Sequence, residues 1–162
     1  MGGSPRKKQL LNKTLVFIAN VLNSLNVKWF IGYGTLLGIV RSQSCIYNDD
    51  DIDIICSYKN YTTLIHLGIQ YDFNVLIYPR VVRFENSMFS PIDFYCADIE
   101  DGNFNDKHEN VIWTNCYPLI RKKWHNTILN LPNDYETKLA RRYGDDWKTP
   151  KKSKGNRKLK YL

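Results

Sequence analysis

Apolar residues recur at helical spacing near the beginning of the chain. Between Pro5 and Asn26, leucine, isoleucine and other apolar side chains return every three or four residues, with polar residues between them. This spacing places the apolar side chains on one face of an amphipathic helix. The apolar run 27–31 predicts a short buried strand after that helix, and a second, short helix is expected at 35–41.

A period of two residues replaces the helical period in the middle of the chain. Acidic and aliphatic residues alternate over 51–55, as expected for a strand whose successive side chains point to opposite faces. Segments rich in β-branched and aromatic residues predict three more strands, at 73–78, 81–84 and 92–96. A helix is expected at 58–67.

The last third of the chain gives weaker signals. The segment 97–110 is polar and contains glycine, so it is predicted to be a loop. Asp134 is placed to cap a helix that runs to Tyr143 and ends at Gly144. Together these elements predict an α+β (mixed α/β) fold, in which helices flank a small mixed sheet.

Length and charge suggest how the chain is organised. It has 162 residues, which favours one domain, and we place this domain at 1–150 with a basic, flexible tail at 151–162. The net charge is +7, and no acid follows Lys148. Such a tail either keeps the protein soluble or attracts a polyanion, for example a nucleotide diphosphate, a nucleic acid or an acidic glycan.

The cysteines and the apolar runs bear on the compartment. The four cysteines form no zinc-binding pattern with the histidines. Cys56 and Cys96 lie in apolar runs and are predicted to be buried thiols, with a disulfide between them as the alternative. No run approaches the ~20 apolar residues that a membrane span requires, and the N-terminus does not resemble a signal peptide. These features predict a cytoplasmic protein.

Two aspartates in the predicted strand at 51–55 are the first candidates for chemistry. Asp51 and Asp53 point the same way, with Cα atoms about 6.5 Å apart, so both carboxylates can reach one metal ion. The apolar residues after Asp53 make an unpaired acid there costly, which favours a metal site over an exposed acidic turn. Hard oxygen ligands suit Mg²⁺. Asp49 and Asp50 precede the regular strand and are weaker candidates.

Two further features add to this site. The segment Gly32-Tyr33-Gly34-Thr35 precedes a predicted helix, and helix N-termini present N–H groups to phosphate oxygens. Asp93 lies inside the apolar strand predicted at 92–96. On its own it is more typical of a paired structural acid, but a neighbouring strand with a third carboxylate would complete a metal site.

These segments resemble the signature of LicD/fukutin-type proteins, which are phosphodiester-forming transferases of the nucleotidyltransferase superfamily. The resemblance lies in residues 34–41, in the run 49–54, and in Asp93 with its neighbours, which match the strand of the third acid. Residues 131–135 and 139–147 are similar to the closing element of the family. A departure lies just before the aspartates, where this chain has Tyr-Asn and the family often has Pro-Trp.

The resemblance implies a nucleotidyltransferase-like fold and a Mg²⁺-dependent activity, with Mn²⁺ as an alternative ion. Family members move a phospho-alcohol, such as phosphocholine or ribitol phosphate, from a CDP-linked donor to a glycan or related hydroxyl. By this resemblance Asp51 and Asp53 hold the metal, and Asp93 completes the metal site and positions or deprotonates the acceptor. The residues expected to bind substrate are Gly34, Thr35, Arg41 and Asp49.

Two other functions are compatible with the same residues. The first is a nucleotidyltransferase that adds a nucleoside monophosphate to a protein, an RNA or a small molecule. The basic tail mildly favours it, although nucleic acid is not the preferred partner. The second is a non-catalytic binding module with the same fold. The presence of all three acids, Asp51, Asp53 and Asp93, favours catalysis over this second alternative.

Overall fold

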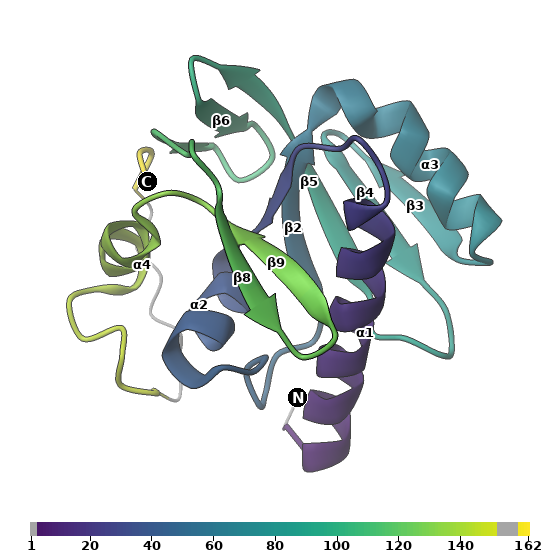
Figure 1. Ribbon diagram of the computed structural model, residues 1–162, viewed down its shortest axis with the longest axis horizontal. Coiled ribbons are helices and arrows are strands. Elements are labelled where there is room, and N and C mark those ends of the chain that lie inside the picture. The colour runs from purple at the N-terminus through teal and green to yellow at the C-terminus, as the bar shows by residue number, and fades with distance from the viewer. Residues whose placement is uncertain (1–2, 152–158) are drawn as a thin grey trace.

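The computed structural model describes residues 3–151 and 159–162, and its centre is a curled mixed sheet (Figure 1). The helices are α1 (Pro5–Asn23), α2 (Tyr33–Ser42), α3 (Tyr61–Gln70) and α4 (Tyr135–Tyr143), with a 3₁₀ turn η1 (Tyr58–Asn60) before α3. The strands are β1 (Trp29–Ile31), β2 (Ile52–Ser57), β3 (Asn74–Tyr78), β4 (Val81–Glu85), β5 (Ile92–Glu100), β6 (Asn103–Asp106), β7 (Val111–Trp113), β8 (Ile120–Trp124) and β9 (Thr127–Leu131).

The strand order of the sheet is β1-β2-β5-β4-β3, and β6 and β7 extend it from the far end of β5. The central pair, β2 and β5, is parallel, whereas the other neighbours are antiparallel. The register sets Asp53 directly opposite Asp93, and Asp93 directly opposite Arg83 of β4. Three charged residues therefore form one row across the middle of the sheet.

The first helix and the last hairpin cover the sheet together. In Figure 1, α1 lies in front of the sheet with the hairpin β8–β9 beside it, and α2 and α4 lie beyond the hairpin. Asn23 at the end of α1 donates a hydrogen bond to the carbonyl of Ile128, at 2.8 Å, and the Trp124 indole donates to the carbonyl of Gln43, at 2.9 Å. These bonds join the hairpin to α1 and to the end of α2.

The core is apolar and continuous between the helices and the sheet. Leu11, Leu15 and Leu22 of α1 belong to the same buried cluster as Phe84 of β4 and Phe94 of β5. Burial of each such side chain contributes roughly 1.5–3 kcal/mol. The N-terminus of α1 is fixed by Ser4, whose hydroxyl accepts a hydrogen bond from the Lys7 N–H at 3.1 Å, and proline follows at the first helical position.

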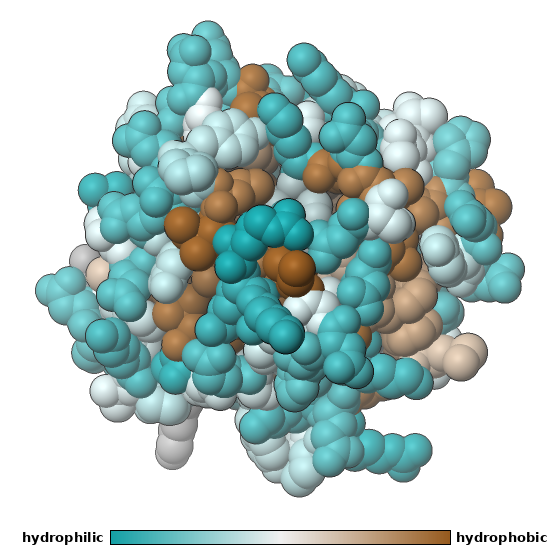
Figure 2. Space-filling model, viewed as in Figure 1, coloured by the Kyte–Doolittle hydropathy of each residue, from teal (hydrophilic) through white to brown (hydrophobic). Residues whose placement is uncertain are grey.

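On the face seen in Figure 2, hydrophilic residues cover much of the surface, and hydrophobic residues emerge in separate places between them. Arg121 and Lys123 of β8 are among the exposed residues. None of the helices in the described part of the chain combines the length and the apolar character needed to cross a bilayer.

The α+β prediction is confirmed, but the prediction of a loop over 97–110 is wrong. Strand β5 continues to Glu100, and β6 pairs with both β5 and β7. An antiparallel strand that packs one face on the core needs apolar side chains on that face alone, and here Phe104 is fully buried between polar neighbours. The first helix also ends at Asn23, earlier than the expected Asn26, and β7, β8 and β9 are additional strands.

Only residues 151 and 159–162 of the predicted basic tail belong to the described part of the chain. Residues 152–158 lie outside the described residues. The last residue, Leu162, is buried, and its backbone N–H donates to the carbonyl of Ile112 at 2.8 Å, so this part differs from the expected flexible tail. Backbone pairing beside β7 holds it. Cys56 and Cys96 are buried free thiols with sulfur atoms 3.9 Å apart, so the predicted disulfide alternative does not occur in this structure.

Candidate active site

Three carboxylates converge where β2 and β5 begin. Asp51, Asp53 and Asp93 each offer an oxygen, and these oxygens all lie within 4.8 Å of one another. Asp53 and Asp93 are 7% and 9% exposed, and Asp51 is half-buried. The convergence follows from the parallel register, because directly opposite residues on neighbouring strands point to the same face.

Burial and the crowding of like charges both act on the protonation of Asp51. Burial raises the pKa of Asp51, the charge of Asp93 raises it further, and the Arg83 guanidinium opposes both effects. All the ligand atoms that the cluster offers are carboxylate oxygens, without histidine or cysteine. This is the donor chemistry of a hard divalent cation, so the cluster is suited to hold one.

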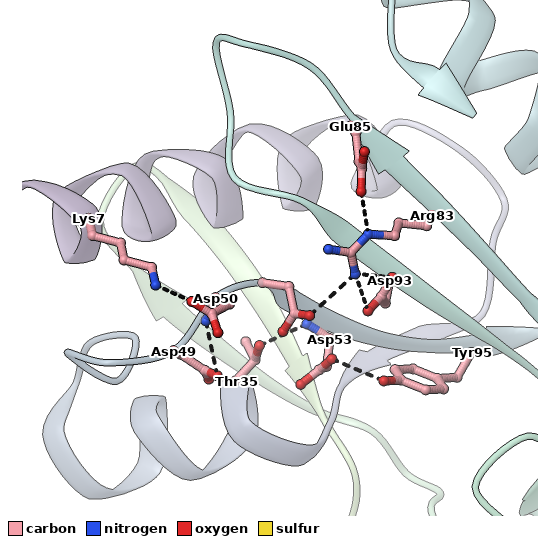
Figure 3. A network of polar contacts seen from close by, with 10 residues as sticks. Lys7, Thr35, Asp49, Asp50, Asp53, Arg83, Glu85, Asp93 and Tyr95 are labelled. Carbon is pink, nitrogen blue, oxygen red and sulfur yellow. Dashed lines mark hydrogen bonds and ion pairs between the residues drawn. The ribbon is translucent and has the colours of Figure 1, made fainter. Parts of the chain in front are cut away.

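Arg83, which the sequence analysis did not identify, lies against these acids (Figure 3). Its Nη1 donates to both carboxylate oxygens of Asp93, each at 2.9 Å, and lies 3.4 Å from Oδ2 of Asp51. Its Nε donates to Glu85 at 2.8 Å. Burial alone would lower the pKa of Arg83, but the hydrogen bond to Glu85 and the charge of Asp93 outweigh it and raise the pKa. Arg83 is therefore permanently charged.

The start of α2 is bound to the strand that carries Asp53. The hydroxyl of Thr35, which is buried, accepts a hydrogen bond from the Asp53 N–H at 2.9 Å, and the Gly32 N–H donates to the Asp53 carbonyl at 3.1 Å. A β-carbon at Gly32 would come within 2.7 Å of the Ile55 side chain, so the close approach of helix and strand requires glycine. Gly34 is buried in the first turn of α2.

The other expected substrate-binding residues lie farther along this segment. Asp49 is buried, and Figure 3 shows it beside Thr35. Arg41 is in the last turn of α2, six positions after Thr35 and therefore about 9 Å along the helix axis. Its Nε is buried without a hydrogen-bond partner in the described part of the chain, and burial lowers the pKa of Arg41. The structure thus groups Asp49 and Thr35 with the three acids, and sets Arg41 at the opposite end of α2.

A pocket of about 280 Å³ opens beside Asp93. It is lined by Tyr78, Val81, Arg83, Asp93, Tyr95 and His108. The Tyr95 hydroxyl donates to Asp53 at 3.3 Å. Burial, and then the charges of Asp53 and Asp93, raise the pKa of Tyr95, so this hydroxyl remains protonated. A pocket with aromatic side chains and the Arg83 guanidinium in its lining therefore lies next to the three acids, on the side of β4 and β5.

Another buried acid, Asp106, contacts the first residue of α2. The Tyr33 hydroxyl donates to it at 2.5 Å, and the backbone N–H groups of His108 and Glu109 donate at 2.9 and 3.2 Å. The Arg142 guanidinium lies 4.3 Å from the centre of the Tyr33 ring. Asp106 was hidden from the sequence analysis because it falls in the segment that was expected to be a loop.

A comparison with protein families identifies the domain that carries these acids. The model of the LicD/FKTN/FKRP nucleotidyltransferase domain matches residues 26–134, a range that includes Asp51, Asp53 and Asp93. The chain belongs to this LicD family. The resemblance to LicD/fukutin-type proteins, predicted from the signature residues, is confirmed. A comparison with curated protein sequences gave no significant match.

Solved nucleotidyltransferases share the fold of this LicD-family chain. The lincosamide antibiotic adenylyltransferase LnuA, bound to lincomycin, has 15% identity and a TM-score of 0.57, with 78% of this chain and 83% of that chain covered. The antibiotic-resistance factor ANT(2'')-Ia has 14% identity and a TM-score of 0.58, with 91% and 78% covered. An antigenic nucleotidyltransferase-like protein from Paracoccidioides brasiliensis has 13% identity and a TM-score of 0.51, with 88% and 68% covered. Family and fold together support a transferase.

Proposed function

We propose that this LicD-family protein is a Mg²⁺-dependent transferase that moves a phospho-alcohol from a CDP-linked donor to a hydroxyl of a glycan or related acceptor. Phosphocholine and ribitol phosphate are the types of group expected. The observation that carries the proposal is the convergence of three carboxylate oxygens within 4.8 Å, next to the N-terminus of α2, in a chain of this family.

The residues present fit a divalent metal of the Mg²⁺ type. Asp51, just before β2, and Asp53, in β2, would hold it, and Asp93 would complete the set from β5. Mg²⁺ prefers oxygen ligands and is usually bound by one or two carboxylates together with phosphate oxygens of the substrate. When bound, such an ion supplies positive charge to the diphosphate of the donor.

The first turn of α2 is assigned to the donor phosphates. Its N–H groups around Gly34 are not all used within the helix, and helix N-termini favour anions. The Thr35 oxygen accepts from Asp53, so the hydroxyl hydrogen is directed elsewhere and can serve a phosphate oxygen. Asp49 is assigned to the same side of the site, and Arg41 to the more distant parts of the donor.

Asp93 is assigned to the acceptor, because the pocket that it lines lies on the β4–β5 side of the acids. In the proposed reaction the acceptor hydroxyl oxygen attacks the phosphorus that carries the alcohol. The bond from this phosphorus to the oxygen of CMP breaks, and CMP leaves with that electron pair. The hydroxyl proton moves to the Asp93 carboxylate. The chain contributes mainly positions and electrostatics, as is usual in phosphoryl transfer.

The proposal is tested by the donor that the protein consumes. Purified protein is incubated with Mg²⁺ and, separately, with CDP-choline, CDP-ribitol and labelled nucleoside triphosphates, and the release of CMP or pyrophosphate is followed. We expect Mg²⁺-dependent release of CMP from a CDP-linked donor. Release of pyrophosphate alone would instead indicate nucleotidyl transfer, and no turnover of any donor would indicate a binding module.

A further inference from the structure

Arg83 occupies oxygens that a metal ion would need. Its Nη1 contacts both carboxylate oxygens of Asp93 at 2.9 Å and lies 3.4 Å from Asp51. The position is built into the sheet, because Arg83 is directly opposite Asp93, which is directly opposite Asp53. An arginine at this point neutralises the acids and, at the same time, competes with any cation that they bind.

We propose that Arg83 is a phosphate-binding residue that pairs with Asp93 while the site is free of metal and turns to the phosphates of the donor once the carboxylate oxygens are taken. The inference rests on the function proposed above and adds to it the residue that links metal binding to donor binding. Arginine is suited to this exchange, since its planar guanidinium forms paired hydrogen bonds with carboxylates and phosphates alike.

The charges around the site favour such an exchange. Three aspartates and one arginine leave the cluster with a net charge of about −2, which a single divalent cation balances. Two cations, the metal and the guanidinium, cannot share the same Asp93 oxygens, because like charges at about 4 Å repel strongly in a partly buried site. Once the metal displaces the Arg83 guanidinium from Asp93, the guanidinium needs another anionic partner. The diphosphate of the donor, which binds together with the metal, can be that partner.

Two neighbours of Arg83 bear on this exchange: Glu85, which holds its Nε, and the pocket beside Asp93, which it lines. Its Nε is held at 2.8 Å by Glu85, two residues along the same strand, so the guanidinium stays near the site when Asp93 releases it. The pocket of about 280 Å³ beside Asp93 is lined by Arg83 itself and by Tyr95. The pocket is assigned above to the acceptor, so the phosphate that is transferred to this acceptor comes next to the pocket and to the guanidinium.

The test compares Arg83→Gln with a matched control, Arg80→Gln. Arg80 is equally buried, with a side chain 26% exposed against 24% for Arg83, and it pairs with Asp98 at 2.8 Å instead of with the three acids. Binding of Mn²⁺ alone, and then of CDP at saturating Mn²⁺, is measured by calorimetry. We expect R83Q to bind Mn²⁺ roughly tenfold more tightly and CDP roughly tenfold more weakly than the wild type. R80Q should match the wild type in both.

A charge-preserving variant and a measurement on the unchanged protein complete the test. Arg83→Lys keeps the positive charge and should bind Mn²⁺ within about threefold of the wild type, a result that loss of packing alone would not produce. In the ¹⁵N-labelled wild type, Mg²⁺ with CDP should move the Nε–Hε resonance of Arg83 and leave that of Arg80 in place. The NMR measurement uses only the wild-type protein, so it tests the role of Arg83 even when R83Q does not fold.

The outcomes separate the two proposals. If the wild type binds Mn²⁺ and R83Q binds it with equal or lower affinity, or if the Arg83 resonance does not move, the role of Arg83 is refuted and the transferase proposal stands. If the wild type and all three variants fail to bind Mn²⁺, the metal site is refuted, and the role of Arg83 is refuted with it.

Discussion

Two groups of buried or half-buried acids in the described part of the chain are built in opposite ways. Asp106 is surrounded by donors: the Tyr33 hydroxyl and two backbone N–H groups all point at its oxygens. Asp51, Asp53 and Asp93 instead face one another within 4.8 Å, and Asp51 and Asp93 share one arginine. Both groups lie near the first turn of α2, so burial alone does not distinguish them.

The difference shows which buried acid has a structural role and which is suited to bind a ligand. A carboxylate that accepts several hydrogen bonds is satisfied and fixes the chain around it. Carboxylates that crowd together repel each other, and the crowding becomes favourable only when a cation is present. The Asp106 group therefore holds the 103–109 segment against α2, whereas the triad is an arrangement for binding.

The largest expected effect is the loss of activity in the triad. Asp53→Asn and Asp51→Asn each remove one charge with almost no change of shape, and we expect each to reduce turnover of the donor by about two orders of magnitude or more. Mn²⁺ affinity should fall in the same variants, as measured by calorimetry. Turnover close to the wild-type rate in both variants would end the proposed mechanism.

A smaller and different effect is expected for Asp106. Asp106→Ala leaves a buried tyrosine hydroxyl and two backbone N–H groups without their acceptor, so the free energy of unfolding should fall by roughly 1–3 kcal/mol. Mn²⁺ affinity of the folded protein should stay within about twofold of the wild type. Urea denaturation and calorimetry provide the two values, and the reverse pattern, lower metal affinity at unchanged stability, would contradict the comparison.

The smallest expected effect is on the thermal stability of the metal-free protein when Asp51 is replaced. The pKa of Asp51 is raised from its usual value of 3.8, chiefly by burial and then by the charge of Asp93. A raised carboxyl pKa means that this group stabilises the fold below pH 3.8, and that the contribution is lost as the pH rises through its folded-state pKa. At pH 7 and without metal, Asp51→Asn should therefore unfold at a slightly higher temperature than the wild type. The gain should disappear near pH 3, and an equal or lower midpoint at pH 7 would count against crowding in the triad.

Much of the fold could be predicted because its early elements follow simple periods. The apolar spacing after Pro5 and the alternation over 51–55 correspond to α1 and to the start of β2. The segment 97–110 could not be assigned in this way. Its strands are antiparallel and bury the side chains of one face, so polar side chains are tolerated on the other face and backbone pairing decides the structure.

The candidate site was predictable only in part, for a related reason. Asp51 directly precedes β2 and Asp53 lies in it, two residues farther along the chain, so their convergence follows from local geometry. The approach of Asp93, and above all of Arg83, depends on the pairing of strands far apart in the sequence. The alternation in β4 puts Arg83 and Glu85 on one face, but no local signal says which strand lies beside them.

The central claim is that Asp51, Asp53 and Asp93 hold one divalent cation together. Anomalous diffraction from crystals soaked with Mn²⁺ and CDP tests this most directly. We predict a Mn²⁺ peak coordinated by an oxygen from each of the three aspartates, with the diphosphate of CDP next to it. A Mn²⁺ ion bound elsewhere, or crystals in which CDP binds while the three acids hold no ion, would contradict the account.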